Sequence, residues 1–426
     1  MKKIIAFLIL NLSLIANAQN HELIGYWQNW NDSNAPYIPL NQVDSRYTII
    51  SVSFAVPSSP SDMTMLFVPD GASQAELISQ MQELQSQGKK IVLSIGGATA
   101  SISLSDGISK NAFINSMNAI LETYPFDGID IDIEHGNSIL ASGSIANPTS
   151  PDCINLIDAI TQIKNHYFTF YNKTMMLTMA PETAYVQGGM SAYGGIWGGY
   201  LPIMDALRND INYIHVQLYN SGSVYGIDGN IYTQGTPDFI VALSEALIQG
   251  FSTAGGFFTG FPASKIVVGL PSCPNAAGGG FLPATQVQSA VKYLMGTGPQ
   301  PGTYQLNQAS GYSDLAGLMT WSINWDKVTT CNATNYEFAQ NFQQLFATLY
   351  TTDFSNRKMT LYPVVATTEL FLSNLNQTEN YQIINGQGQI IQQRFLDPNS
   401  AILVADLKSG LYILRIANQN FKFIKR

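Results

Sequence analysis

The chain has 426 residues, of which 46% are hydrophobic and 12% charged, with a formal net charge of −9. A single α/β barrel takes about 250 residues, so this length allows one barrel and one smaller domain. The low charge density and negative balance disfavour nucleic acid or an anionic membrane as partner, because both are bound through clustered basic residues. The composition therefore indicates a neutral substrate or ligand.

The first 18 residues have the order of a secretory signal: a basic start at 1–3, a mostly apolar run at 4–15 and a small-residue end at 16–18. The apolar run is too short for a permanent transmembrane helix, and no later stretch approaches the roughly 20 apolar residues that a span needs. We therefore expect an exported protein without a membrane span, whose mature chain begins near Gln19.

The three cysteines, Cys153, Cys273 and Cys331, are too few and too widely spaced for a disulfide scaffold or a metal motif. Export makes one bridge, such as Cys273 to Cys331, chemically feasible. Three buried thiols that pack as small apolar side chains are an equally good interpretation. No catalytic role is expected of them.

Eight short apolar runs separated by helix-compatible segments predict buried strands. They lie at 23–27, 47–54, 91–95, 128–133, 175–179, 213–218, 266–270 and 318–322. Eight buried strands alternating with helices favour a closed (β/α)8 barrel, the TIM barrel, over an open sheet. The interval 271–316 is rich in glycine and proline and is predicted to be mostly loop.

After Tyr350 the pattern changes to short alternating strands, such as 369–372 and 410–416, with turn residues between them. Period-2 alternation with such turns predicts a small β-sandwich. The expected organisation is therefore a signal peptide at 1–18, a (β/α)8 catalytic domain at 19–352 and a C-terminal β-sandwich at 353–426.

The strongest chemical signal is an acid series at 127–134, in which Asp130, Asp132 and Glu134 alternate with isoleucines. Because strand side chains alternate faces, the three carboxyl groups share the face inside the barrel. Residues two apart lie about 6.6 Å apart at Cα, so their charges couple and at least one proton stays in the group. Glu134 lies nearest the end where barrel enzymes carry out chemistry and is the expected proton donor. Asp127 has the opposite parity and is expected to fix the start of the strand.

Two other interpretations of the acid series are open. Isoleucine alternating with acid is also typical of a half-buried strand with one wet face, and carboxylates suit a divalent cation. Inside a parallel barrel, however, unpaired acids without a function would be costly, and no further acid lies at an obvious partner position. We therefore expect no metal and no other cofactor.

Four further motifs accompany the acid series in chain order: LSIGG at 93–97, MAPE at 179–182, QLYN at 217–220 and MTWSINWD at 319–326. Together the five segments resemble the glycoside hydrolase family 18 chitinases, over about residues 22–345. The resemblance implies an endo-acting, retaining hydrolase of β-1,4-linked N-acetylglucosamine, with chitin or chitooligosaccharides as substrate.

The resemblance also implies roles for individual residues. The N-acetyl oxygen of the substrate would act as the nucleophile, an exception to the two-carboxylate scheme. Glu134 would protonate the glycosidic oxygen, and Asp132 would hydrogen-bond the acetamido N–H. Asp130 would hold Asp132 through a shared proton. Tyr219 would steady the acetamido oxygen, and Trp321 would form the floor under the sugar.

The remaining expected sugar-binding residues are Met179, Gln217, Tyr26, Trp27 and Asn220. Family members often have aspartate where this chain has Asn220, so hydrogen bonding near the catalytic acid should differ. The resemblance further implies cis peptide bonds at 53–54 and 321–322. In the family that the chain resembles, members with deep, tunnel-like clefts usually carry an α+β insertion between the seventh and eighth barrel strands. The sequence shows no such segment, so an open groove and endo-type cleavage are expected.

The acid motif also serves endo-β-N-acetylglucosaminidases that act on N-glycans, and the barrel also serves chitin lectins that typically lack the acid. The presence of Glu134 favours an enzyme over a lectin, and the motifs of strands 5 and 8 favour a chitinase. His135 could tune Glu134, although a loop histidine without a catalytic role is the preferred interpretation.

The C-terminal segments 409–416 and 422–426 resemble the sorting domains of the type IX secretion system, although 361–365 departs from their usual Pro-Asn-Pro start. A carbohydrate-binding β-sandwich is the alternative. The resemblance implies export machinery as a partner and a secreted, extracellular or cell-surface location.

Overall fold

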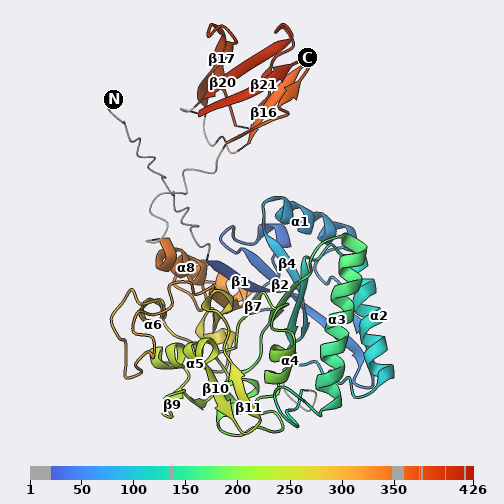
Figure 1. Ribbon diagram of the computed structural model, residues 1–426, viewed down its shortest axis with the longest axis vertical. Coiled ribbons are helices and arrows are strands. Elements are labelled where there is room, and N and C mark those ends of the chain that lie inside the picture. Colours follow the sequence, from blue (N-terminus) through green and yellow to red (C-terminus); the bar gives the residue numbers. More distant parts are fainter. Residues whose placement is uncertain are drawn as a thin grey trace, which may run out of the picture. The chain divides into compact units, whose positions relative to one another are not determined.

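The computed structural model describes residues 21–134, 139–347 and 359–426, apart from 374, 376–377, 399 and 417–418. The chain divides into two compact units, one ending at Phe346 and the other beginning at Ala347 (Figure 1). The expected signal peptide, His135 and the expected boundary at 352/353 lie outside the described residues. Over the described ranges, no helix is long and apolar enough to cross a bilayer.

Parallel strands form the wall of a barrel in the first unit (Figure 1). In sheet order they are β12 (Val267–Pro271), β13 (Gly317–Trp321), β1 (Glu22–Gln28), β2 (Ile49–Ser59), β4 (Lys90–Gly96), β5 (Gly128–Asp132), β6 (Met176–Met179) and β7 (Tyr213–Ile214). Parallel bridges from Ile214 to Ile266 and from Gln217 to Gly269 join the two ends of this sheet. The predicted (β/α)8 barrel is confirmed, and each predicted strand overlaps one of these strands.

Helices cover the outside of the barrel. They are α1 (Gln74–Ser86), α2 (Gly107–Thr123), α3 (Pro151–Tyr171), α4 (Leu201–Ala206), α5 (Pro237–Gln249), α6 (Ala284–Leu294), α7 (Ile323–Lys327) and α8 (Glu337–Ala347). The local sequence determines where two of these helices begin. Ser73 and Glu76 form a capping box at the N-terminus of α1, and Asp106 and Ser109 form one at the N-terminus of α2. Short 3-10 helices are η1 (Leu40–Gln42), η2 (Thr183–Tyr185), η3 (Gln187–Met190), η4 (Ala263–Lys265) and η5 (Pro274–Ala276).

The barrel unit also contains short antiparallel strands outside the parallel wall. β3 (Asp62–Leu66) pairs with the end of β2, while β8 (Ser223–Tyr225) pairs with β9 (Ile231–Thr233) and β10 (Gly250–Thr253) with β11 (Gly256–Thr259). The interval between β12 and β13, all of it described, contains η5 and the crossover helix α6 and is otherwise loop, as predicted.

The second unit consists of two β-sheets. One has the order β14 (Thr360–Tyr362), β16 (Glu369–Ser373), β19 (Ile402–Leu403); the other has the order β15 (Val365–Ala366), β21 (Gln419–Lys425), β20 (Gly410–Ile416), β17 (Glu379–Asn385), β18 (Ile390–Leu396). Leu370 and Ile402 from the first sheet share a buried cluster with Ile383 and Leu414 from the second. This common core is that of the predicted sandwich.

Cys273 and Cys331 form a disulfide with a Cα–Cα distance of 5.8 Å. The bond joins the loop that follows β12 to the loop that follows α7. Cys153 is a buried free thiol. Of the two interpretations that the sequence left open, the bridge is therefore the correct one.

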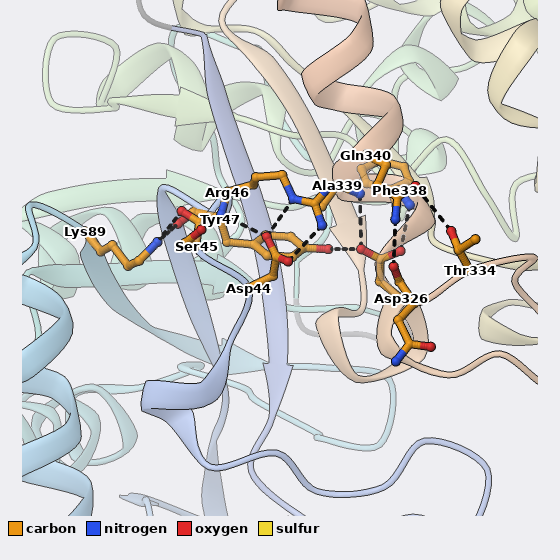
Figure 2. A network of polar contacts seen from close by, with 11 residues as sticks. Asp44, Ser45, Arg46, Tyr47, Lys89, Asp326, Thr334, Phe338, Ala339 and Gln340 are labelled. Carbon is orange, nitrogen blue, oxygen red and sulfur yellow. Dashed lines mark hydrogen bonds and ion pairs between the residues drawn. The ribbon is translucent and has the colours of Figure 1, made fainter. Parts of the chain in front are cut away.

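A buried carboxylate fastens the start of α8 to the barrel (Figure 2). Asp326 accepts hydrogen bonds from the Tyr47 hydroxyl at 2.6 Å and from the backbone N–H groups of Phe338 at 2.7 Å and Ala339 at 3.2 Å. The two N–H groups belong to the first turn of α8, which has no intrahelical partner for them. Burial outweighs these donors and raises the pKa of Asp326 to about 6.

This raised pKa predicts a pH-dependent stability. The native state keeps the Asp326 proton up to pH of about 6, whereas an unfolded aspartate loses it near its ordinary value of 3.8. The contribution of the protonated Asp326 to the free energy of unfolding is therefore fully present below pH 3.8 and is lost as pH rises through the native pKa. Between pH 4 and pH 7, we expect the wild type to lose roughly 2 to 3 kcal/mol of stability relative to the variant Asp326→Asn.

Urea unfolding followed by tryptophan fluorescence measures this difference. The five tryptophans all lie between positions 27 and 325, so the signal reports on the barrel unit alone. The variant Asp44→Asn is the matched control, because the pKa of Asp44 is lowered and its contribution should change in the opposite direction with pH. Identical pH slopes for the wild type and Asp326→Asn would contradict the prediction.

Candidate active site

The acid series lies inside the barrel at the carboxyl end of β5. Asp130 is fully buried and Asp132 is 2% exposed, while Ile129 and Ile131 on the opposite face are fully buried. Glu134 follows the strand and is half-buried. The carboxyl groups thus run from the closed interior toward the end of the strand where the loops begin.

Asp130 is held by hydrogen-bonding groups from neighbouring strands. Its Oδ2 accepts from the Tyr26 hydroxyl at 2.5 Å and the Ser94 hydroxyl at 2.8 Å. Its Oδ1 accepts from the Thr178 hydroxyl at 2.6 Å and lies 3.3 Å from His215 Nε2. Burial acts to raise the pKa of Asp130, but the imidazole and the hydroxyl donors outweigh it and hold this pKa below its usual value. Asp130 is therefore a buried anion.

The pKa of Asp132 is shifted in the direction opposite to that of Asp130. Burial raises its pKa well above the usual range, and repulsion from Glu134 and Asp130 adds to this effect. Asp132 hydrogen-bonds Glu134, and Gln217 Nε2 donates to both, at 2.9 Å to Asp132 Oδ1 and 3.0 Å to Glu134 Oε1. The raised pKa favours a proton on Asp132, next to its hydrogen-bond partner Glu134. The sharing of a proton between Asp132 and Asp130 that the resemblance implies stays a prediction.

Tyr219 lies beside the pair as a neutral phenol. It is 6% exposed, and burial together with the nearby Asp132 and Glu134 raises its pKa well above the usual value. The loop at 278–280 packs against this part of the chain. Asn220, with φ of 53°, accepts a hydrogen bond from the Gly278 N–H at 2.8 Å. A Cβ at Gly280 would approach the Tyr219 Cα to 2.6 Å, so only glycine fits there.

Aromatic rings form one wall of the site. Trp321 stacks on Phe54 with ring centroids 5.9 Å apart and 12° between the planes, and Trp30 lies 6.1 Å from Phe54. All three rings are partly exposed, and Tyr26 packs behind Trp321. The peptide bonds 53–54 and 321–322 are both cis, which confirms that expectation.

Two of the expected sugar-binding residues lie elsewhere. Trp27 is fully buried, and its indole N–H donates to the Ile38 carbonyl at 2.8 Å. Met179 is also fully buried and pairs with Ile131, on the strand face opposite to Thr178. The structure therefore brings neither side chain to the carboxyl groups, since each occupies the outward-facing parity of its strand.

Two others, Tyr26 and Asn220, have contacts different from those expected. Tyr26 is 1% exposed and is a donor to Asp130 rather than a surface for a sugar ring. Asn220 binds the loop backbone. Gln217, in contrast, lies at the centre of the site, where it bridges two acids.

Sequence reasoning missed the positions of Thr178, His215 and Phe54 in the site, and it missed the contact of Ser94 with Asp130. Ser94 and Thr178 stand directly beside Asp130 in the strand register, so an alignment of inward-facing positions could have found them. Asp127 was placed correctly: it accepts hydrogen bonds from the Ile91 N–H and from Gln85 at the start of β5. Within the described ranges, no group of three or more His, Cys, Asp or Glu side chains is arranged to hold a metal ion.

Comparison with known proteins identifies the barrel unit. Residues 22–288 match the sequence profile of the glycosyl hydrolases family 18. The chain belongs to this family. Residues 360–426 match the secretion system C-terminal sorting domain, so the family 18 barrel is joined to a sorting domain.

The family 18 chain resembles several named proteins. It is 45% identical to chitinase Chi52 of Paenibacillus xylanexedens, over 72% of this chain and 59% of that protein. It is 44% identical to chitinase D of Niallia circulans, over 74% of this chain and 60% of that protein. The chain thus spans about three fifths of the length of these relatives. The crystal structure of a family GH18 chitinase from Chromobacterium violaceum superposes with a TM-score of 0.68 at 35% identity, covering 77% of this chain and 83% of that one.

The anchoring of Asp130 predicts a stability effect in this family 18 barrel. Tyr26→Phe removes one donor from a fully buried carboxylate, which should cost about 1 to 3 kcal/mol at pH 7. Because the native pKa of Asp130 is lowered, its contribution is present above the unfolded pKa and is lost as pH falls through the native value. The cost of the substitution should therefore shrink in acid.

Urea unfolding at pH 7 and at successively lower pH measures this cost. Tyr213→Phe is the matched control, since its hydroxyl makes a longer, 3.3 Å contact with Glu22 in a part-buried position. A loss at Tyr26→Phe that equals the control, or that does not change with pH, would be inconsistent with Asp130 as the buried anion.

Proposed function

We propose that this protein is an endo-acting chitinase that hydrolyses β-1,4 linkages between N-acetylglucosamine units with retention of configuration. The observation that supports this best is the hydrogen-bonded pair of Glu134 and Asp132, bridged by Gln217, in which burial raises the pKa of Asp132. The pair lies at the end of a buried acid series and beside a neutral phenol, Tyr219, with an aromatic wall that includes Trp321. Two relatives, chitinase Chi52 and chitinase D, are named as chitinases, which agrees with this substrate.

In the proposed first step, Glu134 gives its proton to the glycosidic oxygen while the acetamido oxygen of the substrate attacks the anomeric carbon. The bond to the leaving sugar breaks, and a cyclic oxazolinium forms on the substrate. The leaving sugar takes up the proton that Asp132 and Glu134 share. Asp132 is then left as a carboxylate that accepts a hydrogen bond from the acetamido N–H and stabilises the positive charge.

In the second step, Glu134 acts as a base on the water that opens the oxazolinium, and the pair recovers its proton. Asp130 serves as a positioning residue: its fixed negative charge opposes ionisation of Asp132 and so keeps a proton within reach of Glu134. Tyr219, as a phenol that stays protonated, is a donor for the acetamido oxygen.

The aromatic wall suits the apolar faces of sugar rings. Trp321, Phe54 and Trp30 are partly exposed and contact one another, so together they offer a continuous apolar surface for the sugar next to the acid. The loop character of the interval between β12 and β13 is consistent with an open groove and with cleavage inside long chains.

Action on N-glycans is the second candidate, since the same acid pair could serve that reaction.

The C-terminal match supports export through a secretion system and a secreted or cell-surface location. Neutral polymer, rather than nucleic acid, suits the low charge of the chain.

Replacing the proton donor gives the most direct test of the residue roles. Glu134→Gln should lower kcat/KM on chitin oligomers by about 10²- to 10⁴-fold, because general acid catalysis is lost, while binding to polymer is kept. Asp127→Asn is the matched control: it neutralises an acid of the same strand that faces away from the site. Hydrolysis by Glu134→Gln at a rate near that of the wild type would rule out this assignment.

Product analysis decides the substrate and the cleavage mode together. Colloidal chitin should be degraded to products of mixed length from the earliest times, whereas release of glycans from a glycoprotein should be slower by orders of magnitude. Dimers dominating the first products would oppose endo cleavage, and preferential glycan release would favour the second candidate. Activity should be unchanged in EDTA, since the proposed steps use only side chains and substrate.

A further inference from the structure

A second groove, of about 680 Å³, lies apart from the carboxyl site. Its walls come from η3 and from the two antiparallel hairpins, β8–β9 and β10–β11, and both β8 and β10 contact η3. Figure 1 shows the paired strands β10 and β11 on the barrel unit. None of the acids, their hydrogen-bond partners or the aromatic wall of the candidate active site lines this groove.

Two exposed aromatic rings line the groove. Phe257 is 60% exposed and Tyr225 is 38% exposed. The strand pairing explains how Phe257 is presented: Phe251 pairs with Phe258, and both are buried, so the alternate face of the same hairpin carries Phe257 outward. A phenylalanine exposed to this extent on a hairpin contributes little to the core and is instead available to a ligand.

The groove carries polar groups but no charged ones. The polar side chains, all exposed, are Ser191, Gln249, Ser252 and Asn307, and the remaining lining residues are apolar, glycine or tyrosine. A different surface cavity, of about 330 Å³, has the charged residues Lys164, Asp210 and Lys265 in its lining. Aromatic faces with hydroxyl and amide groups and no charge are the surface that a neutral sugar chain needs.

The groove is also connected to the loops of the candidate active site. The segment 183–191 that carries η3 follows β6, the strand of Thr178, and β8 begins three residues after Asn220. A chain bound in the groove would therefore be held on the same domain, by loops that continue directly from the catalytic strands. Such tethering raises the local concentration of a polymer substrate without a new catalytic contact.

We propose that this groove is a second binding site for N-acetylglucosamine polymer, with Phe257 and Tyr225 as the stacking platforms. The proposal rests on the proposed chitinase function for the identity of the polymer. Its role is to hold long or insoluble chains, so it should matter for polymer and not for short soluble oligomers that fill only the catalytic site.

The test compares the full-length protein with a double variant, Tyr225→Ala with Phe257→Ala. Phe168→Ala is the matched control, because Phe168 is 54% exposed on α3 and is not part of the groove. Binding to insoluble chitin is measured by depletion from solution, with Glu134→Gln added to every variant so that the polymer is not consumed. In the same series without Glu134→Gln, kcat/KM is measured on a soluble chitin tetramer.

Each stacked ring should account for about a threefold to tenfold change in affinity. The double variant should therefore bind insoluble chitin at least about ninefold more weakly than wild type, and Phe168→Ala should bind as wild type does. Turnover of the tetramer should stay within twofold for all variants. Unchanged thermal unfolding would show that the exposed substitutions leave the fold intact.

Polymer binding by the double variant that stays within twofold of wild type would overturn the groove as a sugar site and would favour a protein partner there. Failure of the wild type to hydrolyse the tetramer would instead overturn the proposed function, and the binding comparison would still decide the groove. Absence of polymer binding by every protein in the series would also overturn the groove proposal.

Discussion

The buried negative charge of Asp130 is the constraint on which the candidate site depends. A carboxylate removed from water costs several kcal/mol unless donors replace its hydration. Here the hydroxyl groups of Tyr26, Ser94 and Thr178 donate from surrounding strands of the barrel, and His215 Nε2 lies 3.3 Å from the carboxylate. Burial raises the pKa of the neighbouring Asp132 well above its usual range, and repulsion from Glu134 and from this fixed charge on Asp130 adds to the effect, so a proton on Asp132 is favoured. The chemistry proposed for Glu134 follows from that proton.

Closure of the barrel makes this arrangement possible. The register of β4, β5 and β6 sets Ser94, Asp130 and Thr178 side by side, and the continuation of β7 adds Gln217 across the acids. Phe54, within β2, and Trp321, the last residue of β13, stack on each other and form the wall. A shift of one residue in any of these strands would turn its side chains to the outer face. The site and the fold are therefore specified by the same register.

Periodicity in the sequence predicts much of this. The apolar runs locate all eight barrel strands, and alternation alone places Asp130, Asp132 and Glu134 on one face and Asp127 on the other. It does not reveal which of two adjacent aromatic residues, Tyr26 or Trp27, points inward, because both fit a buried strand. His215 is similarly hidden in an apolar run. The location of the proton and the loop contact of Asn220 depend on distances between strands and loops that no local pattern contains.

The groove lined by Phe257 and Tyr225 was beyond prediction for a related reason. Its hairpins, β8–β9 and β10–β11, consist of strands of three or four residues, too short for a clear alternation. Their side chains meet only after the barrel has folded. Function outside the central acids is therefore visible only in the assembled surface.

Substrate-assisted hydrolysis by Glu134 and Asp132 is the central claim, and the configuration of the first product tests it most directly. Proton NMR during hydrolysis of N-acetylglucosamine oligomers reports the anomer released before mutarotation. Attack by the substrate's own acetamido oxygen, followed by water, is a double displacement, so the account predicts the β anomer at the earliest times. Initial release of the α anomer would contradict it.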